Sequence, residues 1–359
     1  MVINRRQFIA MSLVSGIIEP QAANSQSTSS DFISCLKGTD GFAAARLDHQ
    51  GAIKHLFPLP ARGHDIALSP QKNKAVIFSR RPGRIAILLD LTENRIVAKI
   101  SSHENRHFYG HGFFSPDGNL LYAAENNFEF EQGCIGIYDA QQNYRRIGEY
   151  DCHGIGPHET VLLADKNTIA CAIGGIATHP EYPRQKLNIA NMAPSLNYLD
   201  RDTGSLIEKV PVPANMHKLS LRHIVEGPDK TVWFCGQYEG PASDKVSIVG
   251  YHISGQPLNF VELPKALIAR TKQYAGSIAI NSDLTQVGVT FPRGNILALF
   301  STESKQLTKI VHSQDVCGIA GVGHKFFASN GKGEFFDLEG VTSKNHGVLW
   351  DNHLQVISN

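Results

Sequence analysis

The sequence lacks several features that would assign it quickly to a functional class. Its 359 residues contain no run of about 18 or more apolar residues, so no membrane-spanning helix is predicted. Neither sign of charge is in excess, with 34 Lys and Arg against 33 Asp and Glu. Since binding to nucleic acid needs a basic surplus, nucleic acid is not an expected partner.

Sequence motifs of common metal and catalytic sites are also missing. No C-x-x-C, G-x-S-x-G, H-E-x-x-H or G-x-G-x-x-G occurs, which argues against zinc ribbons, common hydrolases, zincins and dinucleotide binding. The chain has six cysteines, an even number that an oxidising compartment could pair. Cys171 and Cys235 lie inside apolar strands, where cysteine serves as a small core residue, and most of the six are expected to be structural.

What the chain does contain is a repeat of about 40 to 65 residues. Each copy begins with a short polar motif and a strand, reaches a Pro/Asp/Gly turn, and continues with two or three further strands. Four short strands per unit predict a propeller blade. The copies span residues 62–100, 109–150, 156–212, 221–263, 274–311 and 315–340.

The two ends of the chain supply one more unit. Residues 31–59 contain three strands, and residues 352–358 form a lone strand that would complete them and close the ring. We therefore predict an all-β fold, a seven-bladed β-propeller forming a single domain over residues 31–359. A six- or eight-bladed ring is the alternative, because an insertion at 175–193 could hide a miscounted strand.

The first 30 residues are expected to be an export signal and linker. Arg5 and Arg6 precede Phe8, and an apolar stretch from Phe8 to Ile18 leads into a polar segment. This order is typical of a twin-arginine signal, which predicts a periplasmic protein. Because that route carries folded proteins, often with a cofactor already bound, it favours a metal or prosthetic group.

Histidines recur at the blade period. His64, His111 and His158 are each 47 residues apart, at the start of the first strand of successive units. First strands line the central channel, so residues at this place converge on the axis. The full set is His64, His111, His158, His223, Ser277, Cys317 and His353.

Two interpretations of this ring remain open. Imidazoles, joined by the Cys317 thiolate, suit iron, copper or zinc, and Ser277 adds a hydroxyl to the cofactor-binding ring. Neighbouring Asp65, Glu159 and Arg222 would orient the imidazoles or anchor a substrate carboxylate. Alternatively, each histidine caps its own strand. Distance limits the first interpretation, because all seven positions could not reach one small ion, whereas two or three adjacent blades could.

Residues outside the ring receive weaker assignments. We expect five further histidines on the surface or in loops: His103, His107, His153, His179 and His217. The loop at 178–196 is long enough to be functional, either as a lid over one channel mouth or packed on the outside. No catalytic residue is identified.

Several motifs together resemble a known bacterial family. They include "RGHDIALSP", "RHFYGHG", "GIGPHE", "GGIATHP", "LSLRH", "YAGSIA" and "DVCGIAG", in fixed order from about residue 40 to 353. The chain is similar to the family called domain of unknown function 1513, although Lys218 stands where that family suggests glutamine. The resemblance implies a twin-arginine leader and an association with periplasmic iron handling.

The leading functional hypothesis is a monomeric periplasmic propeller that binds a metal ion or metal-containing ligand in its channel, in iron uptake or redox chemistry. A non-catalytic scaffold for periplasmic protein partners is the alternative. A third hypothesis is an enzyme that acts on a small organic ligand and uses a ring histidine as general base.

Overall fold

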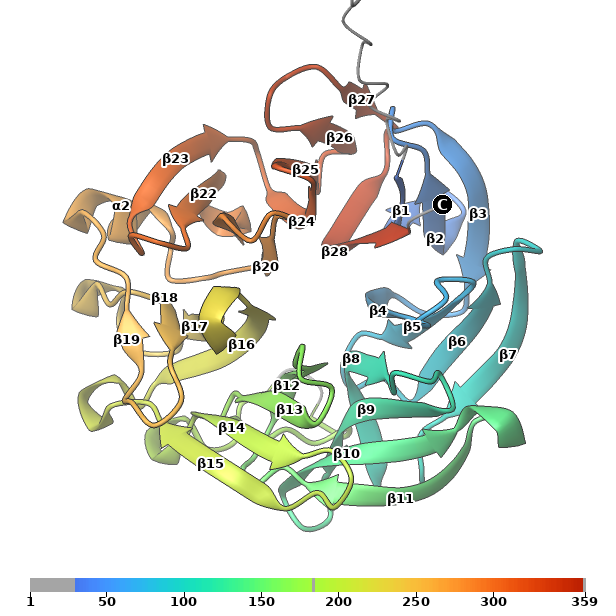
Figure 1. The fold of residues 1–359 in the computed structure, drawn as a ribbon, viewed down its shortest axis with the longest axis horizontal. Coiled ribbons are helices and arrows are strands. Elements are labelled where there is room, and N and C mark those ends of the chain that lie inside the picture. Colours follow the sequence, from blue (N-terminus) through green and yellow to red (C-terminus); the bar gives the residue numbers. More distant parts are fainter. Residues whose placement is uncertain (1–29, 183–184, 358–359) are drawn as a thin grey trace, which may run out of the picture.

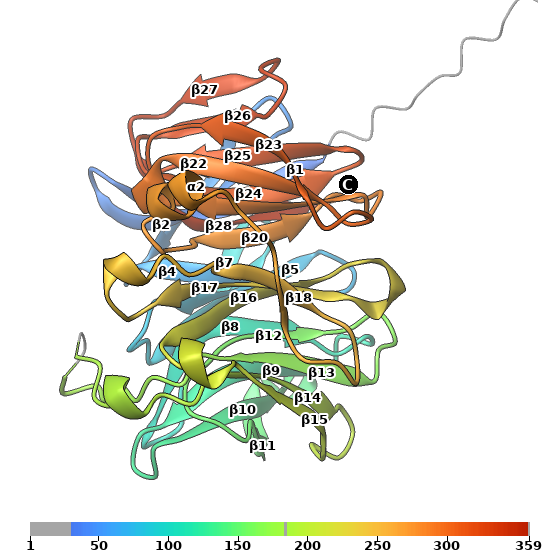
Figure 2. The same ribbon diagram turned by 90° about the vertical axis from the view of Figure 1, so that its left-hand side faces the viewer.

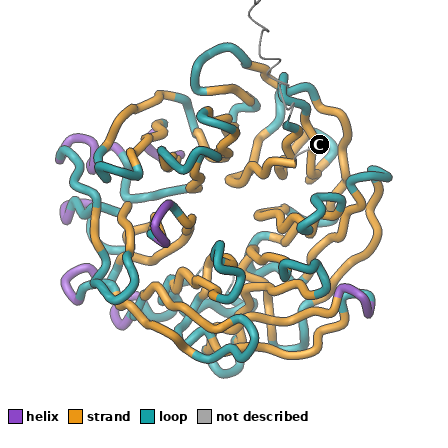
Figure 3. The backbone as a smooth tube through the Cα atoms, viewed as in Figure 1, coloured by secondary structure: helices purple, strands orange, loops and turns teal. Residues whose placement is uncertain are grey.

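The computed structural model describes residues 30–182 and 185–357. The predicted export signal falls on residues 1–29 and lies outside the described residues. In the described part, seven four-stranded antiparallel sheets surround a central axis (Figure 1). Strands and the loops that join them make up nearly all of the ring, and its helices are short (Figure 3).

The second to fourth blades follow one another along the chain. Blade 2 consists of β4 (Gly63–Leu68), β5 (Lys74–Ser79), β6 (Ile85–Asp90) and β7 (Arg95–Ser101). Blade 3 consists of β8 (Arg106–Phe114), β9 (Leu120–Asn127), β10 (Gln132–Asp139) and β11 (Arg145–Asp151). Blade 4 consists of β12 (Pro157–Leu162), β13 (Thr168–Ile173), β14 (Ser195–Asp200) and β15 (Leu206–Pro211).

The remaining blades complete the ring. Blade 5 consists of β16 (Leu219–Glu226), β17 (Val232–Tyr238), β18 (Val249–His252) and β19 (Asn259–Phe260). Blade 6 consists of β20 (Ser277–Ile280), β21 (Gln286–Phe291), β22 (Ile296–Ser301) and β23 (Leu307–His312), and helix α2 (Lys265–Arg270) precedes it. Blade 7 consists of β24 (Val316–Val322), β25 (Lys325–Asn330), β26 (Glu334–Asp337) and β27 (Ser343–Asn345).

Blade 1 joins the two ends of the described chain. Strand β28 (Leu349–Ile357) is its innermost strand and pairs antiparallel with β1 (Asp31–Gly38), with Phe32 opposite Val356. Strands β2 (Gly41–Leu47) and β3 (Ile53–Leu59) continue the sheet outward. The predicted seven blades and their closure by the C-terminal strand are confirmed, and the six- and eight-bladed alternatives were wrong.

The core lies between neighbouring blades. The largest apolar cluster draws on blades 4, 5 and 6 through residues such as Leu196, Phe234 and Val289. Inner strands are buried along most of their length, whereas the outermost strand β7 is largely exposed. This gradient places the inner strands in the interior around the axis and the outer strands toward solvent.

The insertion predicted at 175–193 connects β13 to β14 and contains the short helix η2 (Ile189–Asn191). In Figure 2 this connection projects from the left-hand face of the ring. Within the described residues, no helix is both long and apolar enough to cross a membrane.

Candidate functional site

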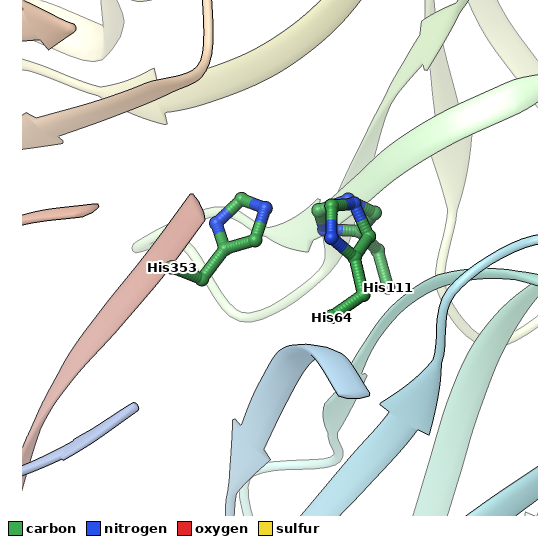
Figure 4. A group of neighbouring side chains, drawn as sticks. All are labelled: His64, His111 and His353. Carbon is green, nitrogen blue, oxygen red and sulfur yellow. The ribbon is translucent and has the colours of Figure 1, made fainter. Parts of the chain in front are cut away.

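Five histidines from five blades meet at the channel axis. His353 lies on β28, His64 on β4, His111 on β8, His158 on β12 and His223 on β16. Each is at most 7% exposed. The ring centroid of His111 is 4.9 Å from that of His64, 4.8 Å from His158, 5.3 Å from His223 and 4.9 Å from His353. Figure 4 shows His64, His111 and His353 brought together from separate strands.

A common backbone feature turns these side chains inward. In each of the five blades, the register between the innermost strand and its neighbour shifts at the histidine or next to it. In β16, for example, Leu221 and His223 oppose adjacent residues of β17, which leaves Arg222 unpaired. Such bulges bend the strand and redirect side chains, and they are common next to functional sites.

Glycine at position 110 allows two of the blades to approach closely. Its φ of +107° is unfavourable for any residue with a Cβ. A Cβ built there would lie 2.6 Å from the Cδ2 atom of His64. The "YGHG" sequence therefore permits the His64 ring to pack against β8, directly beside His111.

Carboxylates hold the imidazoles from behind. The Nδ1 atom of His111 is 3.1 Å from Asp65, and that of His223 is 3.2 Å from Glu159. Because the ionised Asp65 carboxylate only accepts, the Nδ1 atom of His111 carries a proton and donates it. In the neutral form of that imidazole, Nε2 keeps its lone pair. Metal-binding histidines are typically oriented in this way.

Several imidazole nitrogens in the ring have no hydrogen-bond partner. They are the Nδ1 atoms of His64 and His158 and the Nε2 atoms of His111 and His353. A buried polar atom left without a partner costs about 1–3 kcal/mol. The clustering of several such atoms at one point fits a ligand that accepts their lone pairs.

Burial favours the neutral form of four of the five imidazoles. Burial lowers the pKa of His64, His158 and His223 well below the usual value, and that of His353 to about 4. His111 differs: burial opposes its charge, but Asp65 and Glu159 outweigh it and raise the pKa. Neutral imidazole is the form that binds metal.

The two carboxylates respond in opposite ways. Burial raises the pKa of Glu159 to about 7, with the Asp65 charge adding to the effect. Burial acts on Asp65 too, but the nearby His353 and His111 prevail and hold its pKa below the usual range. Asp65 is therefore the fixed negative charge of the ring, whereas Glu159 titrates near neutral pH.

Donor atoms of the ring form groups compact enough for a metal ion. The atoms of His64, His111 and His353 all lie within 4.8 Å of one another, as do those of His111, His158 and His223. Asp65, His111 and Glu159 form a third such group. All seven ring positions were expected to be too far apart to bind one ion together, but that limit does not apply to these groups of three. His111 belongs to all three groups.

The two other predicted ring members have different surroundings. The Cys317 thiol points to the backbone oxygens of Ser329, Trp350 and Asp351, at 3.6, 3.5 and 3.3 Å. Burial raises its pKa, so the thiol stays protonated. Ser277 is buried in β20 opposite Thr290. Among the described residues, Cys317 does not belong to any of the groups of possible metal donors.

Sequence reasoning missed Asp351. Its carboxylate accepts a hydrogen bond from Arg62 at 2.5 Å and lies 3.6 Å from the Nδ1 atom of His64. The one sequence signal for Asp351 is its position two residues before His353. Both residues lie in the segment of β28 where the register with β1 shifts.

The expectation that His107 lies at the surface was wrong. It is fully buried in β8, where its Nε2 accepts from Asn126 at 3.0 Å and its Nδ1 donates to the Phe108 oxygen at 3.1 Å. The burial of His107 could not be predicted from its neighbours in sequence, because residues that cover its ring, including Thr178, come from the distant 178–196 loop. The other four histidines of that set are exposed or half-buried.

A cavity of about 960 Å³ leads from one face of the molecule to the imidazoles. His64, His158 and His223 line it, together with Arg222 and Tyr109. The loop at 178–196 takes part in this mouth, because Lys186 lines the cavity and Thr178 contacts Tyr109. Its position agrees with the predicted lid more than with packing on the outside.

Comparisons with known proteins bear on the family and the fold. The family model described as "Protein of unknown function (DUF1513)" matches residues 57–357. The chain belongs to this family. The resemblance in its motifs is thereby confirmed. No curated protein matches the sequence.

One solved structure supports the architecture of this family member. A chain of Kuenenia stuttgartiensis hydrazine synthase matches with a TM-score of 0.61 and 12% identity, covering 88% of this chain and 89% of that one. At that identity the likeness concerns the fold alone.

Proposed function

We propose that this protein is an exported β-propeller that binds a transition-metal ion at the histidine ring. The observation that carries the proposal is the convergence of five buried imidazoles, four of which have a nitrogen without a hydrogen-bond partner. Strand capping, the alternative explanation, would leave those nitrogens bonded to backbone.

The chemistry of the donors limits the choice of ion. Imidazole nitrogen suits iron, copper and zinc, whereas calcium and magnesium prefer oxygen ligands. His111 and His223, oriented by Asp65 and Glu159, are the best-prepared ligands. His64, His158 and His353 supply the remaining nitrogens, and Cys317 is left out because its thiol is engaged with backbone oxygens.

Residues of the chain would also control access and protonation. The cavity gives access to the ring, so an ion there would meet molecules that enter by that mouth. The carboxyl group of Glu159, hydrogen-bonded to His223, is placed to accept or release a proton beside the ion. A role in periplasmic iron uptake or redox chemistry agrees with the twin-arginine-like leader and with the family association.

The test is the metal content and absorbance spectrum of protein exported through its own leader and purified without a histidine tag or chelator. Near-stoichiometric iron, copper or zinc, lost in the double variant His111→Ala/His223→Ala, is the expected result. A matched Ser277→Ala variant should keep the metal. If metal is absent after soaking in ferrous, cuprous and zinc salts, the site proposal fails and the scaffold interpretation takes its place.

A further inference from the structure

The cavity above the histidines has a strongly basic lining. Its arginines are Arg62, Arg80, Arg81, Arg222 and Arg293. Two lysines add to this charge, and the two aspartates in the lining oppose it. One of these, Asp351, is shared between Arg62 and Arg80. The chain as a whole is nearly neutral, so this concentration of positive charge is local.

Arg222 is the most unusual member of the lining. It is 4% exposed, and its Nε and Nη2 atoms have no hydrogen-bond partner. The nearest carboxylate oxygen, on Glu239, is 3.7 Å from Nη2 and is beyond hydrogen-bond distance. Burial and the charge of Arg81 lower its pKa to about 10, so the guanidinium remains charged at neutral pH.

The geometry of the unpartnered atoms indicates what would bind there. Nε and Nη2 lie on one edge of the planar guanidinium and can donate two parallel hydrogen bonds to a carboxylate or phosphate. The bulge in β16 that turns His223 to the axis also leaves Arg222 unpaired within the strand. The arginine is therefore placed beside the imidazoles by the same backbone feature.

The walls of the cavity suit an organic molecule more than a bare inorganic ion. Tyr109 and Tyr274 line it, and the guanidinium of Arg293 lies 3.9 Å from the centre of the Tyr274 ring. A volume of about 960 Å³ is that of a small-molecule pocket. Among the described residues, no carboxylate is recorded within ion-pair distance of Arg81 or Arg293.

We propose that the cavity is a binding site for an organic polycarboxylate. Arg222 would donate two hydrogen bonds to one carboxylate, and Arg81 and Arg293 would form ion pairs with others. These arginines come from three different parts of the ring: the β5–β6 connection, β16 and the turn before β22. The three arginines can therefore bind separate carboxylates of one ligand. The site does not depend on the metal, although His64, His158 and His223 lie within reach of whatever binds.

The experiment is calorimetric titration of the metal-free protein with propane-1,2,3-tricarboxylate at low ionic strength. This probe carries three carboxylates and no hydroxyl chelating group. Its neutral trimethyl ester is the matched ligand control, and inorganic phosphate is a second probe. Using metal-free protein separates the outcome from the proposed metal site, which is tested by metal content alone.

We expect the tricarboxylate to bind and the trimethyl ester to fail. Arg222→Gln should weaken binding about tenfold or more, and Arg222→Lys should also weaken it because lysine lacks the two-pronged donor edge. Arg145→Gln, an exposed arginine on the outer strand β11, should leave binding unchanged. If Arg222→Gln does not fold, Arg81→Gln/Arg293→Gln provides the same test.

Four results would overturn the assignment, and three of them concern the tricarboxylate, its ester and the variants. They are absence of tricarboxylate binding to the wild type, equal binding of the ester, and unchanged affinity in the folded arginine variants. Phosphate binding as tightly as the tricarboxylate would also overturn it, since the site would then recognise a simple oxyanion.

Discussion

His111 donates a hydrogen bond from Nδ1 to the buried carboxylate of Asp65, 3.1 Å away, across the boundary between blades 3 and 2. The same carboxylate lies 3.8 Å from the Nδ1 atom of His353. The negative charge of Asp65 therefore holds the proton on Nδ1 of His111 and also faces the imidazole of His353. Since Asp65 is adjacent in sequence to His64, a single dipeptide supplies one ring member and the group that orients another.

Replacing Asp65 with asparagine should weaken metal binding about 10- to 100-fold. The amide removes the charge that holds the proton on Nδ1 of His111, so the proton can move to Nε2 and block the lone pair. Competition titration with a chromophoric chelator would measure the affinity. Ser277→Ala, at the same level of the channel on β20, is the control and should bind as the wild type does. Equal affinity in D65N and the wild type would contradict the assigned role.

The pH dependence of the metal-free protein should reflect its buried neutral histidines. A native pKa below the usual 6.5 means that the unfolded chain binds the proton first as pH falls. Stability is therefore fully present above pH 6.5 and declines below it, by at most about 1.4 kcal/mol per pH unit for each such histidine. For His353 the decline continues to about pH 4. The raised pKa of Glu159 has the opposite effect on stability. The protonated carboxyl group stabilises the native state below pH 4.5, and this stabilisation is lost as pH rises from 4.5 to about 7.

Urea unfolding between pH 8 and pH 5 would test this dependence. His158→Gln removes one neutral imidazole whose pKa is depressed by burial and by the charge of Arg222. The variant should show a slope between pH 6.5 and 5 that is shallower by about one proton. His103→Gln, at an exposed position, is the matched control. An unchanged slope in H158Q would mean that His158 is charged in the native protein.

Cys317 is expected to be dispensable for metal binding. Its thiol contacts three backbone oxygens and packs in the core between blades 7 and 1. Cys317→Ala should keep the metal content and spectrum while lowering stability by about 1–2 kcal/mol through lost packing. Loss of metal, or a spectral change typical of removing a thiolate ligand, would show that Cys317 is a metal ligand after all.

The sequence revealed the blades and the histidines because both follow a period. Strand alternation and turn residues mark each unit, and the 47-residue spacing of His64, His111 and His158 reports the distance between equivalent positions. Equivalent positions in a closed ring must face the axis. Thus the five imidazoles could be brought together without coordinates.

Side-chain direction could not be predicted in the same way. Ser277 and Cys317 occupy the equivalent position, yet the thiol of Cys317 turns to the oxygens of Trp350 and Asp351 on the neighbouring β28. That contact depends on a bulge in another blade, far away in sequence. Asp351 was missed for the same reason, since its partners Arg62 and His64 belong to blade 2 and the segment leading into it.

Gly110 provides a test of the close packing between blades 2 and 3. Gly110→Ala introduces a Cβ that would lie 2.6 Å from the His64 ring, at a φ of +107° that alanine rarely adopts. We expect a loss of about 1–3 kcal/mol in unfolding free energy and a weaker metal affinity, because the His64 ring must move. Gly148→Ala in the outer strand β11 is the matched control, since a Cβ there meets nothing within 4 Å. Chemical denaturation and metal titration of both variants would decide. If G110A matched G148A in both measurements, the packing of His64 against β8 would not be what positions it in the ring.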